Sequence, residues 1–369
     1  MTSNRYTMAM VKKTFLAQPR GFCAGVEMAI KALTFLSNTF EKPVYCYHEI
    51  VHNKIVVKRF EEKGVIFIDS IDEVPKDAVV MLSAHGTAPE IVEESSSGNR
   101  ISVNAVCPLV TKVHHEAKIR SKKDYKILYV GHHGHDEAIG TKAVAPENIF
   151  VIENEEQLEE ATKSFDENSQ VALLAQTTLA VEEWQTMQDL AKSKYPNLWT
   201  ASRGDLCFAT TNRQSAVRQL VKLCDSIIVI GSINSSNTLA LEKVAKEQGC
   251  ERVFRIDGPD DIDNCNIKES DIVGVTAGAS APEDIVQAVI EKLNAVEGVE
   301  IVDTIMEDEY FPPPRELREL ATDLNYAIFD IFNTRRNQLG LNRLEVDATK
   351  LRTVFVNDRA MVATDGLQP

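Results

Sequence analysis

The sequence repeats one short pattern three times, at RGFCAGVEMAI (20–30), NAVCPLVTKVHHEA (104–117) and DLCFATTNRQSAV (205–217). Each copy places a cysteine at a predicted strand-to-helix turn, directly before a run with helical apolar spacing. A second polar motif follows each cysteine at a nearly constant distance: 29 residues separate Cys23 from His52, 28 separate Cys107 from His135, and 28 separate Cys207 from Ser235. Matched offsets of this kind indicate an internal threefold repeat.

Short β-branched runs alternate with helical stretches of ten or more residues, which is typical of parallel α/β units. The runs lie at 79–82, 126–130, 171–175, 226–230 and 271–275. We therefore expect an α/β fold of three similar small modules with mainly parallel sheets around a pseudo-threefold axis (a trefoil), plus a C-terminal extension. The expected bounds are 12–106, 107–203, 204–300 and 301–369. Strand-turn-helix units repeat in many α/β proteins, so the recurring cysteine is the stronger signal.

The balance of charged residues restricts the partners of this protein. The 369 residues include 40 basic and 55 acidic side chains, which give a net charge of −15. This charge repels nucleic acid and anionic membrane surfaces, so a bound phosphate must be held by local geometry. The sequence contains no signal-peptide run and no segment with the length of a spanning helix, so we expect a cytoplasmic protein.

Seven cysteines in a chain of this length do not predict a disulfide framework in a reducing compartment. Those of the repeat, Cys23, Cys107 and Cys207, each precede a helix, and a helix N-terminus favours the thiolate that binds metal. The other four are expected to be small buried hydrophobic residues: Cys46, Cys224, Cys250 and Cys265. The repeat therefore predicts a shared metal centre with one cysteine from each module.

Three thiolates alone do not identify the metal. Structural zinc sites usually pair their ligands at CxxC spacing, and these three cysteines are unpaired, which argues against zinc. A [4Fe-4S] cluster commonly has four cysteine ligands, so three would leave one iron open to a substrate. Gly21 and Gly25 flank Cys23 and would let the backbone approach a bulky inorganic core.

Polar loops follow the predicted strands in equivalent repeat positions. GSINSSNT (231–238) offers Ser235, Ser236 and Asn237, and TAGASAP (276–282) offers Ser280. Backbone N–H groups and hydroxyls at a helix start form a phosphate cradle that needs no net positive charge. The same residue types also serve as ordinary helix caps, so each loop alone is weak evidence.

Three histidines lie in strand-end loops, where they would donate hydrogen bonds to a diphosphate: His52, His85 and His135. Glu137 shares a loop with His135, and a sheltered carboxyl beside an open metal would act as a proton donor. Thr177 occupies the corresponding loop of the second unit, where it would orient a substrate hydroxyl or pass on a proton. The remaining histidines are interpreted as surface residues or local caps: His48, His114, His115, His132 and His133.

Nine ordered motifs resemble the hydroxymethylbutenyl diphosphate reductase family over residues 12 to 315. They are PRGFCAGVEMAI (19–30), HEIVHNK (48–54), SAHGT (83–87), CPLVTKVHHEA (107–117), GHHGHDEAIGT (131–141), AQTTL (175–179), CFATTNRQSAV (207–217), GSINSSNT (231–238) and VTAGASAPEDIVQ (275–287). The resemblance implies reductive dehydroxylation of (E)-4-hydroxy-3-methylbut-2-enyl diphosphate to isopentenyl and dimethylallyl diphosphates, the last step of the non-mevalonate isoprenoid pathway.

The resemblance also implies a role for each site residue. One [4Fe-4S] cluster would be held by Cys23, Cys107 and Cys207 and would keep one open iron. The substrate would be bound by His52, His85, His135, Thr177, Ser235, Ser236, Asn237 and Ser280. Glu137 would donate the proton, and a ferredoxin or flavodoxin would supply electrons.

Two other functions remain open, and the C-terminal extension departs from the family. One is a three-cysteine cluster dehydratase of quinolinate-synthase type, and the other is a non-catalytic redox or iron sensor that binds phosphate. Apolar residues at helical spacing predict a helix docked on the body: Leu317, Leu320, Leu324, Ile328 and Ile331. We expect a loosely ordered tail from 335 to 369.

Overall fold

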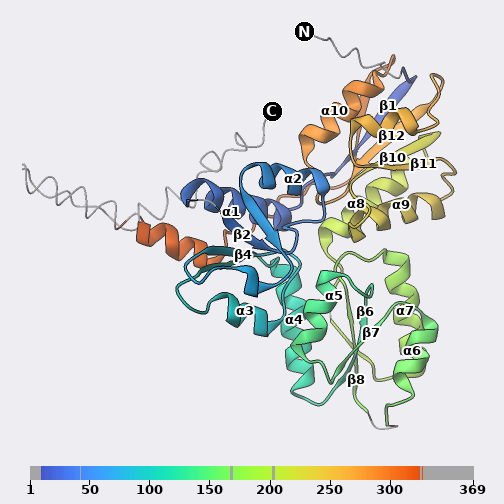
Figure 1. The fold of residues 1–369 in the computed structure, drawn as a ribbon. Coiled ribbons are helices and arrows are strands. Elements are labelled where there is room, and N and C mark those ends of the chain that lie inside the picture. The colour runs from blue at the N-terminus through green and yellow to red at the C-terminus, as the bar shows by residue number, and fades with distance from the viewer. Residues whose placement is uncertain (1–9, 42, 167–168, 202–203, 325, 327–369) are drawn as a thin grey trace, which may run out of the picture.

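The computed structural model describes residues 10–41, 43–166, 169–201, 204–324 and 326, which form three β-sheets with helices packed on them (Figure 1). The strands of each sheet run parallel. Each sheet and its helices make one lobe, and the blue, green and yellow-to-orange lobes of Figure 1 meet at a common centre. The predicted architecture of three parallel α/β modules is confirmed.

The first sheet has the strand order β3-β2-β4-β5. Its strands are β2 (Val44–Tyr47), β3 (Val65–Ile68), β4 (Val79–Leu82) and β5 (Ile101–Asn104). The connecting helices are α1 (Ala24–Thr39), α2 (Lys54–Glu62), the 3₁₀ helix η1 (Ile71–Glu73) and α3 (Pro89–Ser95). Helix α2 begins where it does because the Asn53 side chain accepts hydrogen bonds from the N–H groups of Ile55 and Val56, both at 3.1 Å.

The second sheet has the order β7-β6-β8-β9. Its strands are β6 (Lys126–Val130), β7 (Ile149–Ile152), β8 (Val171–Ala175) and β9 (Trp199–Thr200). Its helices are α4 (Pro108–Ser121), α5 (Asp136–Val144), α6 (Glu155–Thr162) and α7 (Val181–Lys194). β8 reads VALLA and is buried throughout, as expected for a central parallel strand covered by helices on both faces.

The third sheet has the order β11-β10-β12-β1-β13. Its strands are β1 (Lys13–Gln18), β10 (Ser226–Ile230), β11 (Val253–Ile256), β12 (Ile272–Ala277) and β13 (Val299–Asp303). Its helices are α8 (Phe208–Leu220), α9 (Ser236–Glu247), the 3₁₀ helix η2 (Pro259–Asn264) and α10 (Glu283–Leu293). Across the three sheets, each of the five strands expected from the sequence is present, as β4, β6, β8, β10 and β12. Only β12 is shifted, from the expected 271–275 to 272–277.

Sheet membership departs from the expected module bounds at both ends of the chain. β1 falls in the span 12–106 assigned to the first module, but it pairs with β12 and β13 of the third sheet. β13 crosses the expected boundary at residue 300. A strand joins the neighbours that satisfy its backbone N–H and C=O groups, and position along the chain does not decide which strands those are. The division into modules by residue range stays a prediction.

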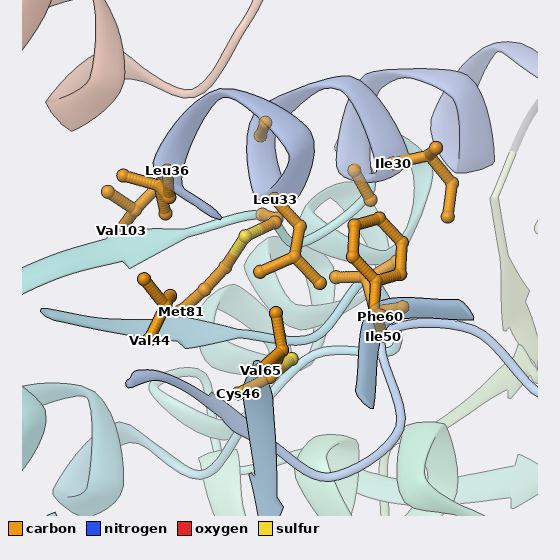
Figure 2. Close-up of a cluster of buried hydrophobic side chains, with 14 of the residues drawn as sticks. Ile30, Leu33, Leu36, Val44, Cys46, Ile50, Phe60, Val65, Met81 and Val103 are labelled. Carbon is orange, nitrogen blue, oxygen red and sulfur yellow. The ribbon is translucent and has the colours of Figure 1, made fainter. Parts of the chain in front are cut away.

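Helix α1 packs its apolar face on the first sheet (Figure 2). Ile30, Leu33 and Leu36 project from one side of α1 because residues three and four apart share a helix face. They pack in one cluster with Met81 of β4 and Val103 of β5, and each of these five side chains is at most 4% exposed. This packing fixes the position of α1 and therefore of the turn that carries Cys23.

Of the four cysteines outside the repeat, two are buried as predicted, and the other two are partly buried against hydrophobic clusters. Cys46 is fully buried in the core beneath α1 (Figure 2), and Cys250 is 7% exposed in the core between α8, α9 and the third sheet. Cys224 packs against that second core, and Cys265 packs against the core beneath α10. Packing in or against a core provides a structural reason for each of the four.

The beginning of the C-terminal extension docks on the body. A helix begins at residue 315, and Leu317 is 5% exposed within the core of the first sheet, with Leu320 packed against the same cluster. The predicted docking of this helix is confirmed at these two residues. Ile328, Ile331 and the tail 335–369 lie outside the described residues. None of the helices in the described ranges has the length and hydropathy to cross a membrane.

Candidate active site

A cavity of about 730 Å³, counted out to its open mouth, is lined by loops from all three modules. All twelve residues predicted from the sequence line it: Cys23, His52, His85, Cys107, His135, Glu137, Thr177, Cys207, Ser235, Ser236, Asn237 and Ser280. The carboxyl ends of parallel strands lie at one edge of a sheet, so the loops that follow them converge where three such edges face one another. The roles of the individual residues stay predictions at this point.

The three cysteines occupy equivalent places in the fold. Cys23, Cys107 and Cys207 are the N-cap residues of α1, α4 and α8. In the part of the chain that the structure describes, none of the three side chains caps its own helix, so the sulfur atoms are available to the cavity. The first N–H groups of α4 approach the Cys107 sulfur, and those of α8 approach the Cys207 sulfur. Each module therefore presents one thiol from the N-cap position of a helix.

Gly25 allows two of these sulfur atoms to approach the same helix. A Cβ atom at Gly25 would lie 2.8 Å from Sγ of Cys107 and 3.9 Å from Sγ of Cys23. The first distance is too short for any side chain, so residue 25 must be glycine unless Cys107 moves. Three thiols that face one cavity, with a glycine where bulk is not tolerated, fit an inorganic core with three cysteine ligands.

The expected ease of ionisation is wrong for the metal-free thiols of Cys107 and Cys207. Burial raises the pKa of Cys107 to about 12, and the neighbouring Cys23 and Cys207 add to the increase. Burial, followed by Cys23, likewise raises the pKa of Cys207 to about 12. The helix N–H groups lower both values, but desolvation outweighs them. A bound cation must therefore displace these protons, and metal binding should release them to solvent.

The Glu137 carboxyl is buried, is held by hydrogen bonds and has a raised pKa. It lies in the first turn of α5 and is 2% exposed. Thr177 donates to both of its carboxylate oxygens, from the backbone N–H at 2.7 Å and from the hydroxyl at 2.9 Å. Burial raises the pKa of Glu137 to about 7, although the two Thr177 hydrogen bonds lower it. Near neutral pH this carboxyl is therefore protonated in a substantial fraction of molecules.

The three predicted histidines form one compact group. The rings of His52 and His85 stack with their centroids 3.9 Å apart, and His135 approaches them edge-on at 5.0 and 6.0 Å. Burial, together with the neighbouring imidazoles, lowers the pKa of His85 well below its usual value and that of His135 to about 3. In the free protein these two rings are therefore neutral at pH 7.

Asp136 and His48 belong to this group, although sequence reasoning did not select either. His48 Nδ1 lies 2.8 Å from Asp136 Oδ1. Burial would raise the pKa of Asp136, but this hydrogen bond and the three surrounding imidazoles together lower it to about 2. Asp136 lies between two predicted residues in the motif GHDE, and His48 opens the motif HEIVHNK, but neither spacing indicates that the two side chains meet.

Two imidazole nitrogens of this group have unmet hydrogen-bonding capacity. Within the described ranges, His52 Nε2 and His85 Nδ1 are buried and have no hydrogen-bond partner. They lie 3.8 and 3.7 Å from Asp136 Oδ2, which is too far for a hydrogen bond. The grouping of His52, His85 and Asp136 has the dimensions of a metal site, and it is equally suited to an anion that imidazoles can contact.

The serine-rich loop forms the start of α9. The Ser235 hydroxyl accepts from the N–H of Thr238 at 3.3 Å, so it caps the helix and keeps its own proton to donate. The Ser236 hydroxyl lies 3.0 Å from that of Thr178, which ties α9 to the loop after β8. A helix N-terminus with two hydroxyls at the cavity wall favours a bound anion.

Asn237 and Ser280 connect this loop to its neighbours. Asn237 Oδ1 accepts from the N–H of Ala279 at 2.9 Å, which fixes the loop after β12. The Ser280 hydroxyl donates to the carbonyl of His52 at 3.0 Å and so joins the third module to the first. Ser280 must rotate its hydroxyl before it can donate into the cavity.

Comparison with known proteins gives consistent matches. A family model described as LytB protein matches residues 14–294. A 4-hydroxy-3-methylbut-2-enyl diphosphate reductase from Rhodopirellula baltica is 44% identical over 313 residues, which cover 84% of this chain and 97% of that protein. A protein of the same name from Streptomyces avermitilis is 43% identical over 314 residues, which cover 85% of this chain and 92% of that protein.

Solved structures give the same result. The E-1-hydroxy-2-methyl-but-2-enyl-4-diphosphate reductase from Plasmodium falciparum superposes with a TM-score of 0.79 at 31% identity, and the match covers 85% of this chain and 99% of that one. An (E)-4-hydroxy-3-methyl-but-2-enyl diphosphate reductase, described as the terminal enzyme of the non-mevalonate pathway, has a TM-score of 0.55 at 28% identity. That match covers 77% of this chain and 99% of the other.

Proposed function

Because this chain belongs to the LytB protein family, we propose that it reduces 4-hydroxy-3-methylbut-2-enyl diphosphate, the substrate in the names of its relatives. The reaction is the terminal step of the non-mevalonate pathway. The products are isopentenyl and dimethylallyl diphosphates, formed when the allylic hydroxyl leaves as water. The reaction consumes two electrons and two protons for each molecule reduced.

One observation carries this proposal: three thiols, three imidazoles, a carboxyl and a hydroxyl-rich helix start all line a single cavity. A diphosphate ester needs hydrogen-bond donors at its anionic end and a reactive centre at its allylic end. The cavity offers both kinds of group, and they come from different modules. A structural zinc site or a plain phosphate site would use only part of this set.

We assign the anionic end of the substrate to the histidine group and the start of α9. His52, His85 and His135 supply imidazole N–H groups, and the two buried nitrogens without partners are the most direct support. The hydroxyls and amide at the start of α9, together with the loop after β12, complete the set: Ser235, Ser236, Asn237 and Ser280. Thr177 would meet the allylic hydroxyl beside Glu137. These contacts hold the C–O bond in a fixed orientation.

We assign a [4Fe-4S] cluster to Cys23, Cys107 and Cys207. The support is the donor set itself: three thiols at equivalent helix starts, facing one cavity beside Gly25. A cluster held by these residues would supply electron transfer and Lewis-acid chemistry at that end of the cavity. A ferredoxin or flavodoxin would deliver the electrons, in keeping with the family resemblance.

Glu137 donates the proton that the leaving hydroxyl needs to depart as water. Its pKa of about 7, raised by burial, keeps the proton available near neutral pH. Thr177 holds the carboxyl in place through both oxygens, and the surrounding protein keeps bulk water away from it. The chain itself therefore performs substrate orientation, water exclusion and proton delivery.

Turnover of the diphosphate tests the function directly. The protein is loaded with iron and sulfide without oxygen, then mixed with the substrate and dithionite-reduced viologen. We expect two viologens oxidised per product and both isoprenoid diphosphates. Elimination without net electron uptake would favour a dehydratase of quinolinate-synthase type, and a loaded protein without turnover would favour a sensor.

Cluster loading tests the three ligands separately from turnover. Cys23→Ser, Cys107→Ser and Cys207→Ser should each lose the brown absorbance or release iron rapidly. Cys265→Ser is the matched control, because Cys265 packs against a different core and should keep full iron content. Full iron and sulfide content in any of the first three variants would remove that cysteine from the ligand set. A Mössbauer spectrum with and without substrate should reveal one iron that responds to it.

A further inference from the structure

Arg213 is a fully buried cation close to two of the three cavity cysteines. It lies in α8, six residues after Cys207, and is 0% exposed. Among the described residues it is the largest side chain that is completely buried. Its guanidinium donates to the carbonyl of Gly21 from Nη2 at 2.8 Å and from Nε at 3.2 Å. Nη1 donates to the carbonyl of Ala209 at 2.9 Å.

These contacts join the backbone before Cys23 to the first turn of α8. Gly21 precedes Cys23 by two residues, and its φ of +63° is a conformation that favours glycine. Arg213 Nη2 also lies 3.5 Å from the carbonyl of Phe22, the residue directly before Cys23. Ala209 belongs to the first turn of α8, directly after Cys207. A single side chain therefore fixes the approach to one cysteine and the helix start of another.

The charge of Arg213 is balanced by Glu307, from the segment that follows β13. Both carboxylate oxygens accept from Arg213 Nη1, at 3.0 and 3.1 Å, and one also accepts from Asn212 Nδ2 at 3.0 Å. Glu307 is partly buried, whereas Met306 beside it is 85% exposed. The segment thus turns one carboxylate inward to meet a buried guanidinium.

We propose that Arg213 and Glu307 form a charge-setting pair that positions Cys23 and Cys207 and tunes the reduction potential of the group those cysteines hold. This inference rests on the cluster assigned above. Neither residue touches the substrate cavity, so both are positioning residues.

The sign of each residue's effect follows from electrostatics. Reduction adds negative charge to the cluster, so a nearby buried cation favours the reduced form and raises the potential. A buried anion does the opposite. Replacing Arg213 should therefore lower the potential, and replacing Glu307 should raise it. A purely structural role predicts no such opposition, because loosening the fold has no reason to shift the potential in two directions.

The experiment measures the potential of the loaded protein by dye-mediated titration without oxygen. We expect Arg213→Gln to shift the reduction potential to more negative values and Glu307→Gln to shift it to more positive values. Glutamine is chosen at residue 307 because it removes the charge but keeps a hydrogen-bonding oxygen. Both shifts should persist at high salt, because the side chains of Arg213 and Glu307 are only 1% and 15% exposed. The rate of iron release to a chelator should rise several-fold in Arg213→Gln, since the Gly21 and Ala209 carbonyls lose their shared donor.

Matched controls come from Arg59 and Asp284, an Arg–carboxylate pair with more exposed side chains. Arg59→Gln and Asp284→Asn should leave potential and iron release unchanged. If Arg213→Gln fails to fold, the isosteric Glu307→Gln alone carries the test. Unchanged potentials in a loaded variant, or shifts of both variants in the same direction, overturn the pair's role. A wild-type protein that cannot be loaded overturns the proposed function instead.

Discussion

Glu137 combines burial, two hydrogen bonds from one threonine and a pKa near 7, and these properties together predict its contribution to rate. Glu137→Gln keeps the shape of the side chain but cannot donate an acidic proton. Turnover should fall by about 10²- to 10⁴-fold, the usual contribution of a general acid. In the unmodified protein turnover should also fall as the pH rises through about 7, because the donor loses its proton there.

Further measurements on Glu137→Gln separate the loss of proton donation from structural damage. Glu137→Gln should retain iron content and substrate affinity, and its residual rate should not follow the alkaline decline. Glu160→Gln, on the exposed side of α6, should behave like the unmodified protein. Wild-type turnover in Glu137→Gln with the same pH profile would contradict the assignment.

A second prediction concerns the close approach of the Cys107 sulfur to Gly25. In Gly25→Ala the new methyl group would lie 2.8 Å from the Cys107 sulfur, so Cys107 or α1 must shift. Iron retention measured against a chelator should fall sharply, while the far-ultraviolet circular dichroism spectrum stays unchanged. Gly258→Ala is the matched control, since its nearest neighbour would lie at an ordinary 3.5 Å. Equal retention in both variants would contradict a close approach at residue 25.

The strand-end loops bring neutral imidazoles to a site for an anion, which predicts proton uptake on binding. Burial and mutual proximity keep His85 and His135 unprotonated at pH 7, with the pKa of His135 at about 3. The negative charge of a bound diphosphate should raise the pKa values of both histidines, so the protein should take up protons when the diphosphate binds.

Calorimetry in two buffers with different ionisation enthalpies, at pH 7, measures this uptake as a difference in apparent binding enthalpy. His133→Gln, an exposed histidine outside the group, should leave the difference unchanged. Identical enthalpies in both buffers would mean that the imidazoles keep one protonation state throughout.

The elements of the three modules were largely predictable from the sequence. Runs such as 126–130 and 171–175 became β6 and β8 without change, because buried parallel strands read as continuous apolar runs. The place of β1 was not predictable. Its partners are about 260 and 285 residues further along the chain, and a local pattern does not specify a partner at that distance.

Sequence reasoning reached the members of the candidate site but not the interactions among them. The threefold repeat, the polar loops beside it and the family resemblance selected twelve of the residues that line the cavity. They did not select Asp136 or His48, whose contact depends on how two modules face each other. The helix-start argument misjudged the ionisation of Cys107 and Cys207, because desolvation is a property of the assembled interior and not of one helix start.

For the molecule as a whole, the C-terminal segment contributes to the core of the first module, so removing that contact should weaken the fold. Leu317→Ala deletes a buried side chain from the cluster beneath α1 and should cost about 2 to 5 kcal/mol of unfolding free energy. Urea unfolding followed by circular dichroism measures the change. Met306→Ala, at an 85% exposed position, should change the free energy by less than about 0.5 kcal/mol. A loss that small in Leu317→Ala would contradict the docking.

The central position of β1 between β12 and β13 affects how the protein is made. A ribosome releases the chain from its N-terminus, so β1 emerges first and has no partner until residues 272–277 and then 299–303 have been synthesised. Until then the nascent strand exposes unpaired backbone groups on both edges, which makes it a target for chaperones and for aggregation. Cys23 follows β1 directly, so its sulfur takes its place beside those of Cys107 and Cys207 only after the partner strands of β1 have been synthesised.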